Sequence, residues 1–307
     1  MLSRPLRIGT RGSPLALAQA NLVAGALRAV HGLDEADVEI VAIRTTGDRI
    51  QDRPLADLGG KALWTKELDR ALAEGETDLS VHSMKDVESV RPDWLRLAAM
   101  LPRADVRDRL IGTASVDEIP ERGRVGTSSP RRAAQIRRLR PDLRVVPIRG
   151  NVATRLGKLR AGECEATLLA AAGLDRLGHG EIGAPVPVDV MLPAASQGAI
   201  GVEVRGGDDA VGRTVAAIAH AGTTEAVGAE RALLAALGGS CHAPAAALAE
   251  VEGERVRLRA QILSEDGAEC AEADVLIARG DRDAAAAVAA DLLARAPDSV
   301  RRHFTGP

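Results

Sequence analysis

The sequence predicts an α/β protein with two similar, doubly wound α/β domains, followed by a small C-terminal α+β domain with a three-stranded antiparallel sheet. Through the first two thirds of the chain, short apolar runs alternate with segments of helical periodicity, which favours mostly parallel sheets. A junction of strand, glycine, Ser-Pro and helix occurs twice, at residues 9–14 and 126–130. In the last third, strands follow one another between two helices.

Length and composition set the broad class. A chain of 307 residues is too long for one ordinary hydrophobic core and suits two or three domains. With 40 basic and 43 acidic residues the chain is slightly acidic overall, and its mixed charge is typical of a soluble globular protein. The apolar runs are far shorter than a membrane span, and the first residues lack the apolar core of a secretory signal. We therefore expect a cytoplasmic protein with no membrane contact.

The cysteines and aromatic residues argue against two kinds of site. Cys164, Cys241 and Cys270 lie far apart and form no CxxC pair, which argues against a disulfide framework and a zinc site. The chain has two tryptophans, one phenylalanine and no tyrosine. Proteins that read nucleic acid usually stack bases on aromatic rings, so a nucleic-acid partner is not expected.

The first domain is predicted over residues 1–101 together with 199–217. Ser13 is a good helix cap, and Pro14 stands at the first helical position, where proline is favoured. The long polar stretch 44–61 is expected to be a lid or binding loop. The predicted strands are 6–10, 38–43, 79–82 and 95–101, and the second helix is 64–74.

The second domain is predicted over residues 104–193 and begins with the second glycine and Ser-Pro junction. Each junction aims a helix N-terminus at a shared cleft if the two domains have the same design. Chance similarity is the alternative, because this junction is common. The further elements are expected at 143–148, 152–160, 166–170 and 171–177. A strand at 198–204 is expected to return to the first domain, which would give the two domains two linking segments and a hinge.

The third domain is predicted over residues 221–307. A helix at 224–237 leads into a glycine-flanked loop that contains Cys241. Strands are expected at 246–251, 255–263 and 269–277, joined by turns at Gly253 and Gly267. Asp281 caps the alanine-rich closing helix, which ends near residue 295.

Residues 122–160 carry twelve basic side chains and one acid, Asp142. Such a segment needs a negative partner, either the rest of the protein or a ligand with several charges. A solvated helix face is the interpretation for the residues Arg137, Arg138 and Arg140. A ligand fits better for the arginines beside turn residues at the ends of elements, which are Arg131, Arg132, Arg149 and Arg155.

Two places carry candidate chemistry. Cys241 lies on a loop rather than in an apolar run, so it is a candidate nucleophile or covalent attachment point, although burial as a small hydrophobe is commoner for cysteine. Lys85 and Asp86 end a short strand, where open α/β sheets bind their ligands. The alternative for this pair is a solvated surface turn. No catalytic serine triad, metal cluster, phosphate-binding loop or dinucleotide fingerprint is present.

Five runs of the sequence, taken together, resemble the hydroxymethylbilane synthase family, also called porphobilinogen deaminases. They are IGTRGSPLALAQA at 8–20, DLSVHSMKDV at 78–87, VGTSSPRR at 125–132, RGNVATRL at 149–156 and LPAASQGAIGVE at 192–203. Cys241, after Gly239 and Ser240, stands where the family keeps its cofactor cysteine. The last sixty residues match only in general pattern.

The resemblance implies a transferase that joins four molecules of porphobilinogen head to tail, with release of ammonia, to form the linear tetrapyrrole hydroxymethylbilane. It implies a covalently bound dipyrromethane primer, attached through a thioether to Cys241. Asp86 matches the catalytic aspartate of the family. Its carboxylate is expected to stabilise the cation left when ammonia departs and to assist deprotonation.

The resemblance also gives the basic residues a ligand, because each pyrrole brings an acetate and a propionate that arginine can bind in a bidentate manner. The residues on family positions that bind the cofactor or substrate carboxylates are Arg11, Ser13, Lys85, Ser129, Arg131, Arg132, Arg149, Arg155 and Arg176. Gln197 falls on a cleft position. No metal is implied.

The sequence departs from the family in the expected lid and beside the cofactor cysteine. Asp57 stands where some members carry a lysine. Lys61 and Trp64 lie in a run where the family has a second glycine and a phenylalanine, so we expect Trp64 to keep an aromatic surface near the active site on a stiffer loop. His242 replaces a glutamine that is common after the cysteine.

Two other classes of function compete with this hypothesis. The doubled α/β domains also resemble two-domain receptors of the periplasmic-binding-protein type, which would bind a small anion without chemistry. A nucleic-acid binder would explain the arginines but neither Asp86 nor Cys241. The favoured hypothesis is an enzyme with porphobilinogen as its small-molecule partner, acting as a cytoplasmic monomer.

Overall fold

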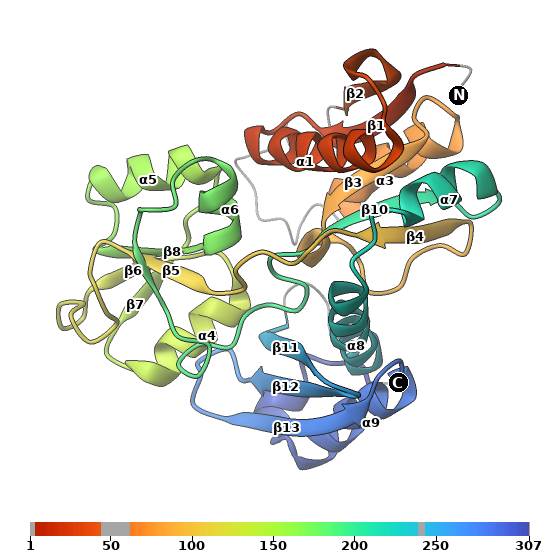
Figure 1. Ribbon diagram of the computed structural model, residues 1–307. Coiled ribbons are helices and arrows are strands. Elements are labelled where there is room, and N and C mark those ends of the chain that lie inside the picture. The colour runs from red at the N-terminus through yellow and green to blue at the C-terminus, as the bar shows by residue number, and fades with distance from the viewer. Residues whose placement is uncertain (1–3, 44–61, 239–242, 307) are drawn as a thin grey trace. The chain divides into compact units, whose positions relative to one another are not determined.

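The computed structural model describes residues 4–43, 62–238 and 243–306, with side chains at 62–64 left out (Figure 1). The expected lid at 44–61 and Cys241 therefore lie outside the described residues. The chain forms two compact units, Met1–Ala104 with Gly198–Thr224, and Asp105–Gln197 with Glu225–Pro307. None of the described helices is both long and apolar enough to cross a membrane.

The first unit contains a five-stranded sheet in the order β2-β1-β3-β10-β4. Its strands are β1 (Leu6–Arg11), β2 (Val38–Ile43), β3 (Leu79–Ser83), β4 (Leu95–Met100) and β10 (Ile200–Arg205). β1 pairs in parallel with β2 and β3, whereas β10 runs antiparallel to both β3 and β4. Four strands thus share one direction, as the mostly parallel prediction requires. The predicted return of the chain to the first domain is confirmed, since β10 fills the gap between β3 and β4.

Helices α1 (Pro14–His31), α3 (Ala62–Ala73) and α7 (Asp209–Ala216) pack on this sheet, with short 3-10 turns η1 (Glu35–Asp37) and η3 (Met84–Asp86). The Ser13 hydroxyl accepts a hydrogen bond from the Ala16 N–H, so the predicted cap of α1 is confirmed. The helix ends at Gly32, whose φ of 63° suits a residue without Cβ. Leu27 of α1 and Val215 of α7 share one apolar core with the strands.

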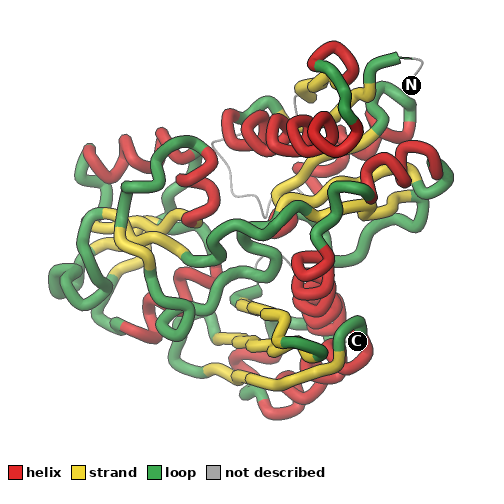
Figure 2. The backbone as a smooth tube through the Cα atoms, in the orientation of Figure 1, coloured by secondary structure: helices red, strands yellow, loops and turns green. Residues whose placement is uncertain are grey.

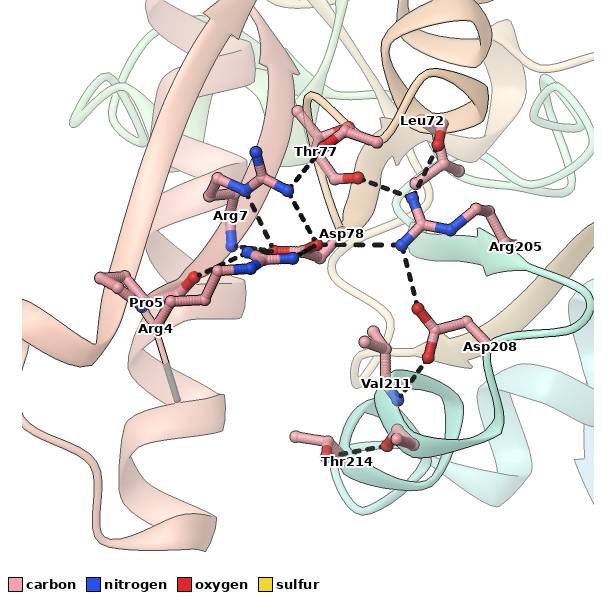
Figure 3. A network of polar contacts seen from close by, with 12 residues as sticks. Arg4, Pro5, Arg7, Leu72, Thr77, Asp78, Arg205, Asp208, Val211 and Thr214 are labelled. Carbon is pink, nitrogen blue, oxygen red and sulfur yellow. Dashed lines mark hydrogen bonds and ion pairs between the residues drawn. The ribbon is translucent and has the colours of Figure 1, made fainter. Parts of the chain in front are cut away.

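Asp78 joins three segments of the first unit just before β3 (Figure 3). Its carboxylate accepts hydrogen bonds from Arg4 Nη2 at 2.6 Å and from the Arg7 backbone N–H at 2.9 Å, and Arg205 Nη2 of β10 lies 3.8 Å away. Its side chain is 2% exposed. Burial alone would raise the pKa of Asp78, but the hydrogen bonds from Arg4 and Arg7 hold it well below its usual range. The network fixes the N-terminal strand to the sheet.

Replacing Asp78 with asparagine should lower the free energy of unfolding by about 2–4 kcal/mol, because it leaves arginines without their anion. The folded-state pKa lies below the unfolded value of about 3.9. The contribution of Asp78 is therefore complete above about pH 5 and is lost as the pH falls through the folded pKa. Denaturant unfolding at pH 7 and pH 3 measures this contribution. The difference in the free energy of unfolding between wild type and variant should be smaller at pH 3 than at pH 7. Asp274→Asn, which removes an exposed ion pair with Arg257, should change stability little; equal effects of the two substitutions would contradict the assignment.

The second unit repeats the sheet design of the first, in the order β7-β6-β8-β5-β9. Its strands are β5 (Asp108–Ile111), β6 (Arg124–Gly126), β7 (Arg144–Val146), β8 (Ala166–Ala170) and β9 (Ala184–Pro185). β6 is parallel to β7 and β8, and β5 is antiparallel to β8 and β9. Helices α4 (Pro130–Leu139), α5 (Val152–Arg160) and α6 (Ala171–Arg176) complete it. Ser129 caps α4 as Ser13 caps α1, so the two junctions share one local structure and the prediction of two similar domains is confirmed.

Two arginines expected on the helix surface also take part in packing. Arg140 pairs with Asp142 at 2.7 Å and donates to the carbonyls of Val116, Asp117 and Ile119, so it fixes the loop before β6. Arg137 donates to the Glu265 carbonyl at 2.7 Å. Both side chains are half-buried at the surface and bind other segments of the chain, so they are not freely solvated. The surface interpretation holds for Arg138, which is exposed.

The remainder of the second unit is the predicted α+β fold (Figure 2). Strands β11 (Ala245–Glu252), β12 (Arg255–Leu263) and β13 (Cys270–Ala278) form a three-stranded antiparallel sheet. The helices are α8 (Ala221–Leu237), α9 (Arg282–Arg295) and α10 (Asp298–Arg301). Leu233 of α8, Leu258 of β12 and Leu292 of α9 are fully buried in its core. The side chains of β12 alternate between buried and less buried, as expected for a strand with one covered face.

The turn between β12 and β13 packs directly on the backbone of α4. Gly267 has φ of +73°, and a Cβ built there would lie 2.2 Å from the Ala134 carbonyl oxygen. Gly253, in the turn before β12, has φ of +58° with nothing within 4 Å of such a Cβ. The two glycines therefore share a conformation and differ in their surroundings.

Gly267→Ala should destabilise the chain by about 2–4 kcal/mol, because it adds a steric clash to the left-handed conformation. Gly253→Ala should lower the free energy of unfolding by about 1 kcal/mol, because alanine is strained in the left-handed conformation. Thermal and denaturant unfolding of both variants measure the difference. Equal losses would mean that the turn does not press on α4.

Candidate active site

A pocket lies at the carboxyl ends of β1 and β3, beside the N-terminus of α1 in the first unit. It encloses about 430 Å³ of space, open solvent included. Its polar lining residues are Arg11, Ser13, Gln19, Thr65, His82, Ser83 and Asp86. The structure thus brings together three residues predicted from the sequence: Arg11, Ser13 and Asp86. Lys85 lies on the same turn as Asp86 and is half-buried, but it is not among the lining residues.

Asp86 is held at the pocket by two buried neighbours. β3 ends at Ser83, and the chain turns through the 3-10 segment Met84–Asp86. The Met84 N–H donates to the Ala199 carbonyl at 3.1 Å, and the Val87 N–H closes the turn on the Met84 carbonyl. Because Met84 and Val87 are both buried, the half-buried Asp86 between them is fixed at the pocket wall.

The N-terminus of α1 favours an anion at this pocket. The first backbone N–H groups of a helix have no partner within the helix and carry partial positive charge. Ser13, the cap of α1, and Arg11, the last residue of β1, both line the pocket. Gln19 Nε2 donates to Ser83 Oγ at 3.2 Å, which ties α1 to the end of β3. The arrangement suits a carboxylate beside a reacting centre.

The second unit holds Arg131 and Arg132 in a buried cluster around Asp108. Oδ2 of Asp108 accepts from Arg131 Nη1 at 2.9 Å, and Oδ1 accepts from Arg132 Nη2 at 2.7 Å. Gln197 Nε2 also donates to Oδ1 at 2.8 Å. Burial alone would raise the pKa of Asp108, but the two guanidinium groups hold it well below its usual range. Asp108 was missed in the sequence, where it stands between two arginines in a short strand that periodicity did not reveal.

This cluster carries a net positive charge inside the protein. Two guanidinium groups face one carboxylate, and the side chains of Arg131 and Arg132 are 4% and 6% exposed. Within the described residues, the buried Nε of Arg131 has no hydrogen-bond partner. A dipyrromethane carries four carboxylates. The net positive charge of the cluster and the Nε–H donor of Arg131 would suit such a group. Direct contact of these two arginines with a ligand stays a prediction, since both already have internal partners.

Gln135 connects the cluster to the third sheet. Its Oε1 accepts from Arg131 Nη1 at 3.0 Å, and its Nε2 donates to Gln261 Oε1 at 2.9 Å. Gln261 lies on β12 and donates to Glu272 of β13. The orientation of Arg131 therefore depends on the sheet that follows Cys241 in the chain.

The other predicted carboxylate-binding residues of the second unit lie near the ends of helices. Ser129 caps α4, and Arg155 Nε donates to the Gly150 carbonyl at 2.9 Å. Burial lowers the pKa of the Arg176 guanidinium at the end of α6. Arg149 precedes α5 and is half-buried. Ligand binding by these four side chains remains a prediction.

The cofactor and lid predictions fall outside what the structure describes. Cys241 and Lys61 are not described, and Trp64 is described only as part of the α3 backbone. Among the described residues, no group of three or more His, Cys, Asp or Glu could hold a metal ion.

Comparison with known proteins decides the family. The family model for the porphobilinogen deaminase dipyrromethane cofactor binding domain matches residues 6–213, and the model for the C-terminal domain matches residues 224–295. The chain belongs to the porphobilinogen deaminase family. The resemblance drawn from the five runs is thereby confirmed and extends into the C-terminal domain. Porphobilinogen deaminases are transferases of tetrapyrrole biosynthesis with a dipyrromethane cofactor, which identifies the class of this enzyme.

Curated relatives agree over nearly the whole chain. The porphobilinogen deaminase of Sphingopyxis alaskensis is 58% identical over 98% of this chain and 96% of its own length. That of Paracoccus denitrificans is 51% identical over 86% of each chain. Among solved structures, a periplasmic substrate-binding protein of an ABC transporter from Coxiella burnetii covers 69% of this chain and 91% of its own, at 14% identity and a TM-score of 0.41.

Proposed function

We propose that this porphobilinogen deaminase makes hydroxymethylbilane at the pocket around Asp86, from four porphobilinogen molecules and a primer attached to Cys241. The observation that carries the proposal is the placement of Asp86 beside Arg11, Ser13 and the N-terminus of α1. A carboxylate and anion-binding groups then line one pocket. Porphobilinogen needs both, because it reacts through a cation and carries two carboxylates.

Asp86 acts on the charge that develops when ammonia leaves. The substrate loses ammonia from its aminomethyl group, and a cation spreads over the methylene carbon and the pyrrole ring. A carboxylate fixed at the pocket wall stabilises that cation and accepts a hydrogen bond from the pyrrole N–H. Because Met84 and Val87 hold its turn rigidly, Asp86 reorganises little during the reaction.

The basic residues bind the acetate and propionate side chains. Arg11 and Ser13 serve the pocket of the first unit, together with Lys85 on the adjoining turn. The second unit contributes the buried Arg131 and Arg132 cluster. The further residues proposed for this role are Ser129, Arg149, Arg155, Arg176 and Gln197. Each added pyrrole brings two negative charges, so several cations are needed as the product lengthens.

The dipyrromethane, when bound, supplies the pyrrole carbon to which the first substrate is joined. Cys241 is proposed as its attachment point, because a cysteine thiolate can form a thioether and Cys241 matches the cofactor cysteine of the family. The net positive charge of the Asp108 cluster supports the proposal that this chain holds a polycarboxylate.

The test is turnover by the purified chain. Incubation with porphobilinogen should release four ammonia molecules for each tetrapyrrole, measured by an ammonia assay and by oxidation of the product to porphyrin. A receptor that only binds anions would release no ammonia. We further propose that the enzyme acts as a cytoplasmic monomer, so light scattering should give the mass of one chain.

A further inference from the structure

His82 is a titratable side chain on the wall of the Asp86 pocket that the proposed mechanism does not use. It lies on β3 and is 7% exposed. In the sheet His82 pairs with Gly201 of β10, which has no side chain. Glu203 lies two residues beyond Gly201 on β10, so its side chain is on the same face of the sheet as His82. The imidazole therefore reaches the Glu203 carboxylate, with Nε2 at 3.2 Å from Oε2.

Glu203 is a buried anion, itself held by Arg91. Arg91 Nε and Nη2 each donate to the Glu203 carboxylate at 2.9 Å. Glu203 is 1% exposed. Burial alone would raise the pKa of Glu203, but His82 and Arg91 lower it to about 2. A charged carboxylate thus stands behind the imidazole at every pH at which the enzyme would work.

Further acids surround the same network. Arg91 Nη2 donates to Asp69 of α3 at 2.6 Å, and Arg91 Nη1 donates to Glu88 at 3.0 Å. Burial raises the pKa of Asp69. The carboxylates of Glu203, Asp69 and Glu88 thus all pair with the one guanidinium group of Arg91. The ion pair with Glu203 fixes the imidazole at the pocket wall.

We propose that His82, supported by the Glu203–Arg91 ion pair, is a second proton-transfer group of the Asp86 pocket. The inference rests on the proposed function. With a proton on Nε2 facing Glu203, Nδ1 is the imidazole nitrogen that keeps a lone pair. Nε2 lies 3.2 Å from Glu203 Oε2, but within the described residues it makes no hydrogen bond of good geometry.

The proposed role solves a conflict in the use of Asp86. Each new carbon–carbon bond joins the methylene carbon of the substrate to the free α-carbon of another pyrrole, and that α-carbon then releases a proton. If Asp86 took this proton, it would have to release it again before the next substrate could lose ammonia beside a charged carboxylate. His82 takes the proton on Nδ1 and the C–H electron pair restores the aromatic ring. Imidazolium then gives the proton to the departed ammonia, which leaves as ammonium, so atoms and charge balance.

Charged groups lie near His82 on several neighbouring elements. They are Glu203 on β10, Asp69 on α3, Arg91 in the loop before β4, Arg11 on β1 and Asp86 on the following turn. Glu203→Gln removes the anion closest to His82, while Arg91 still forms ion pairs with Asp69 and Glu88. In this variant kcat should therefore fall, because the imidazole loses the anion that orients it.

The decisive experiment uses His82→Gln, with His31→Gln as a matched control on an exposed histidine of α1. The substrate is porphobilinogen with hydrogen or deuterium at its free α-carbon. His82→Gln should lower kcat about 10- to 100-fold, flatten the low-pH limb and give a larger isotope effect than wild type, because proton removal becomes slower. A purely structural role would change neither the isotope effect nor the pH profile, and that outcome would overturn the proposal.

If thermal unfolding shows that His82→Gln does not fold, the isotope effect of the wild-type enzyme still tests the proposal. Its isotope effect should rise as the pH falls and His82 becomes unable to accept a proton. An isotope effect that stays constant from about pH 5 to pH 9 would contradict the assignment. Absence of turnover in the wild type would instead overturn the proposed function.

Discussion

Asp86→Ala should lower kcat for hydroxymethylbilane formation by about a thousandfold or more while the protein remains folded. In the proposed mechanism the carboxylate faces the centre where a cation develops, and no other acid lines this pocket among the described residues. Asp86→Asn should lose nearly as much, because it keeps the shape of the side chain and removes only the charge. Single-turnover ammonia release and thermal unfolding measure the two expectations.

Asp93 provides the matched control for this prediction. It is an exposed aspartate in the loop before β4, so Asp93→Ala should keep wild-type turnover. Substantial activity in Asp86→Ala, at a melting temperature near that of the wild type, would remove Asp86 from the mechanism.

Cys241→Ser should abolish turnover, because serine cannot form the thioether that holds the primer. The effect is expected to be complete rather than partial, since without the primer the first substrate has no pyrrole to which it can be joined. Cys270→Ser is the matched control: Cys270 is half-buried at the start of β13, and its replacement should leave turnover unchanged. Porphobilinogen consumption by both variants, with unfolding curves beside it, tests this.

Normal turnover by Cys241→Ser would exclude a primer at that position. Equal loss in both cysteine variants would point to a general effect on the C-terminal domain instead.

Most of the fold followed from short-range signals. The Ser13 and Ser129 caps, the Ser-Pro junctions and the helical spacing identify α1 and α4 because these signals act within one turn of chain. The strand β5 was missed, since it is four residues long and begins with a charged residue. Its position in the sheet depends on pairing with β8, about sixty residues away, which periodicity cannot show.

The site was predicted in part. Asp86, Arg11 and Ser13 meet at one pocket because β1 and β3 are neighbours in the sheet. The acids that pair with the arginines could not be found in this way. Asp108 and Glu203 are buried charges on strands, and a lone acid in a strand usually indicates an exposed position. Their partners come from distant segments, so only the folded chain brings them together.

The mass of the intact purified protein tests the central claim most directly. The wild-type chain should exceed its sequence mass by two porphobilinogen units less two ammonia molecules, and Cys241→Ser should show no excess. A wild-type chain that turns over porphobilinogen at its unmodified mass would contradict a covalent primer on Cys241.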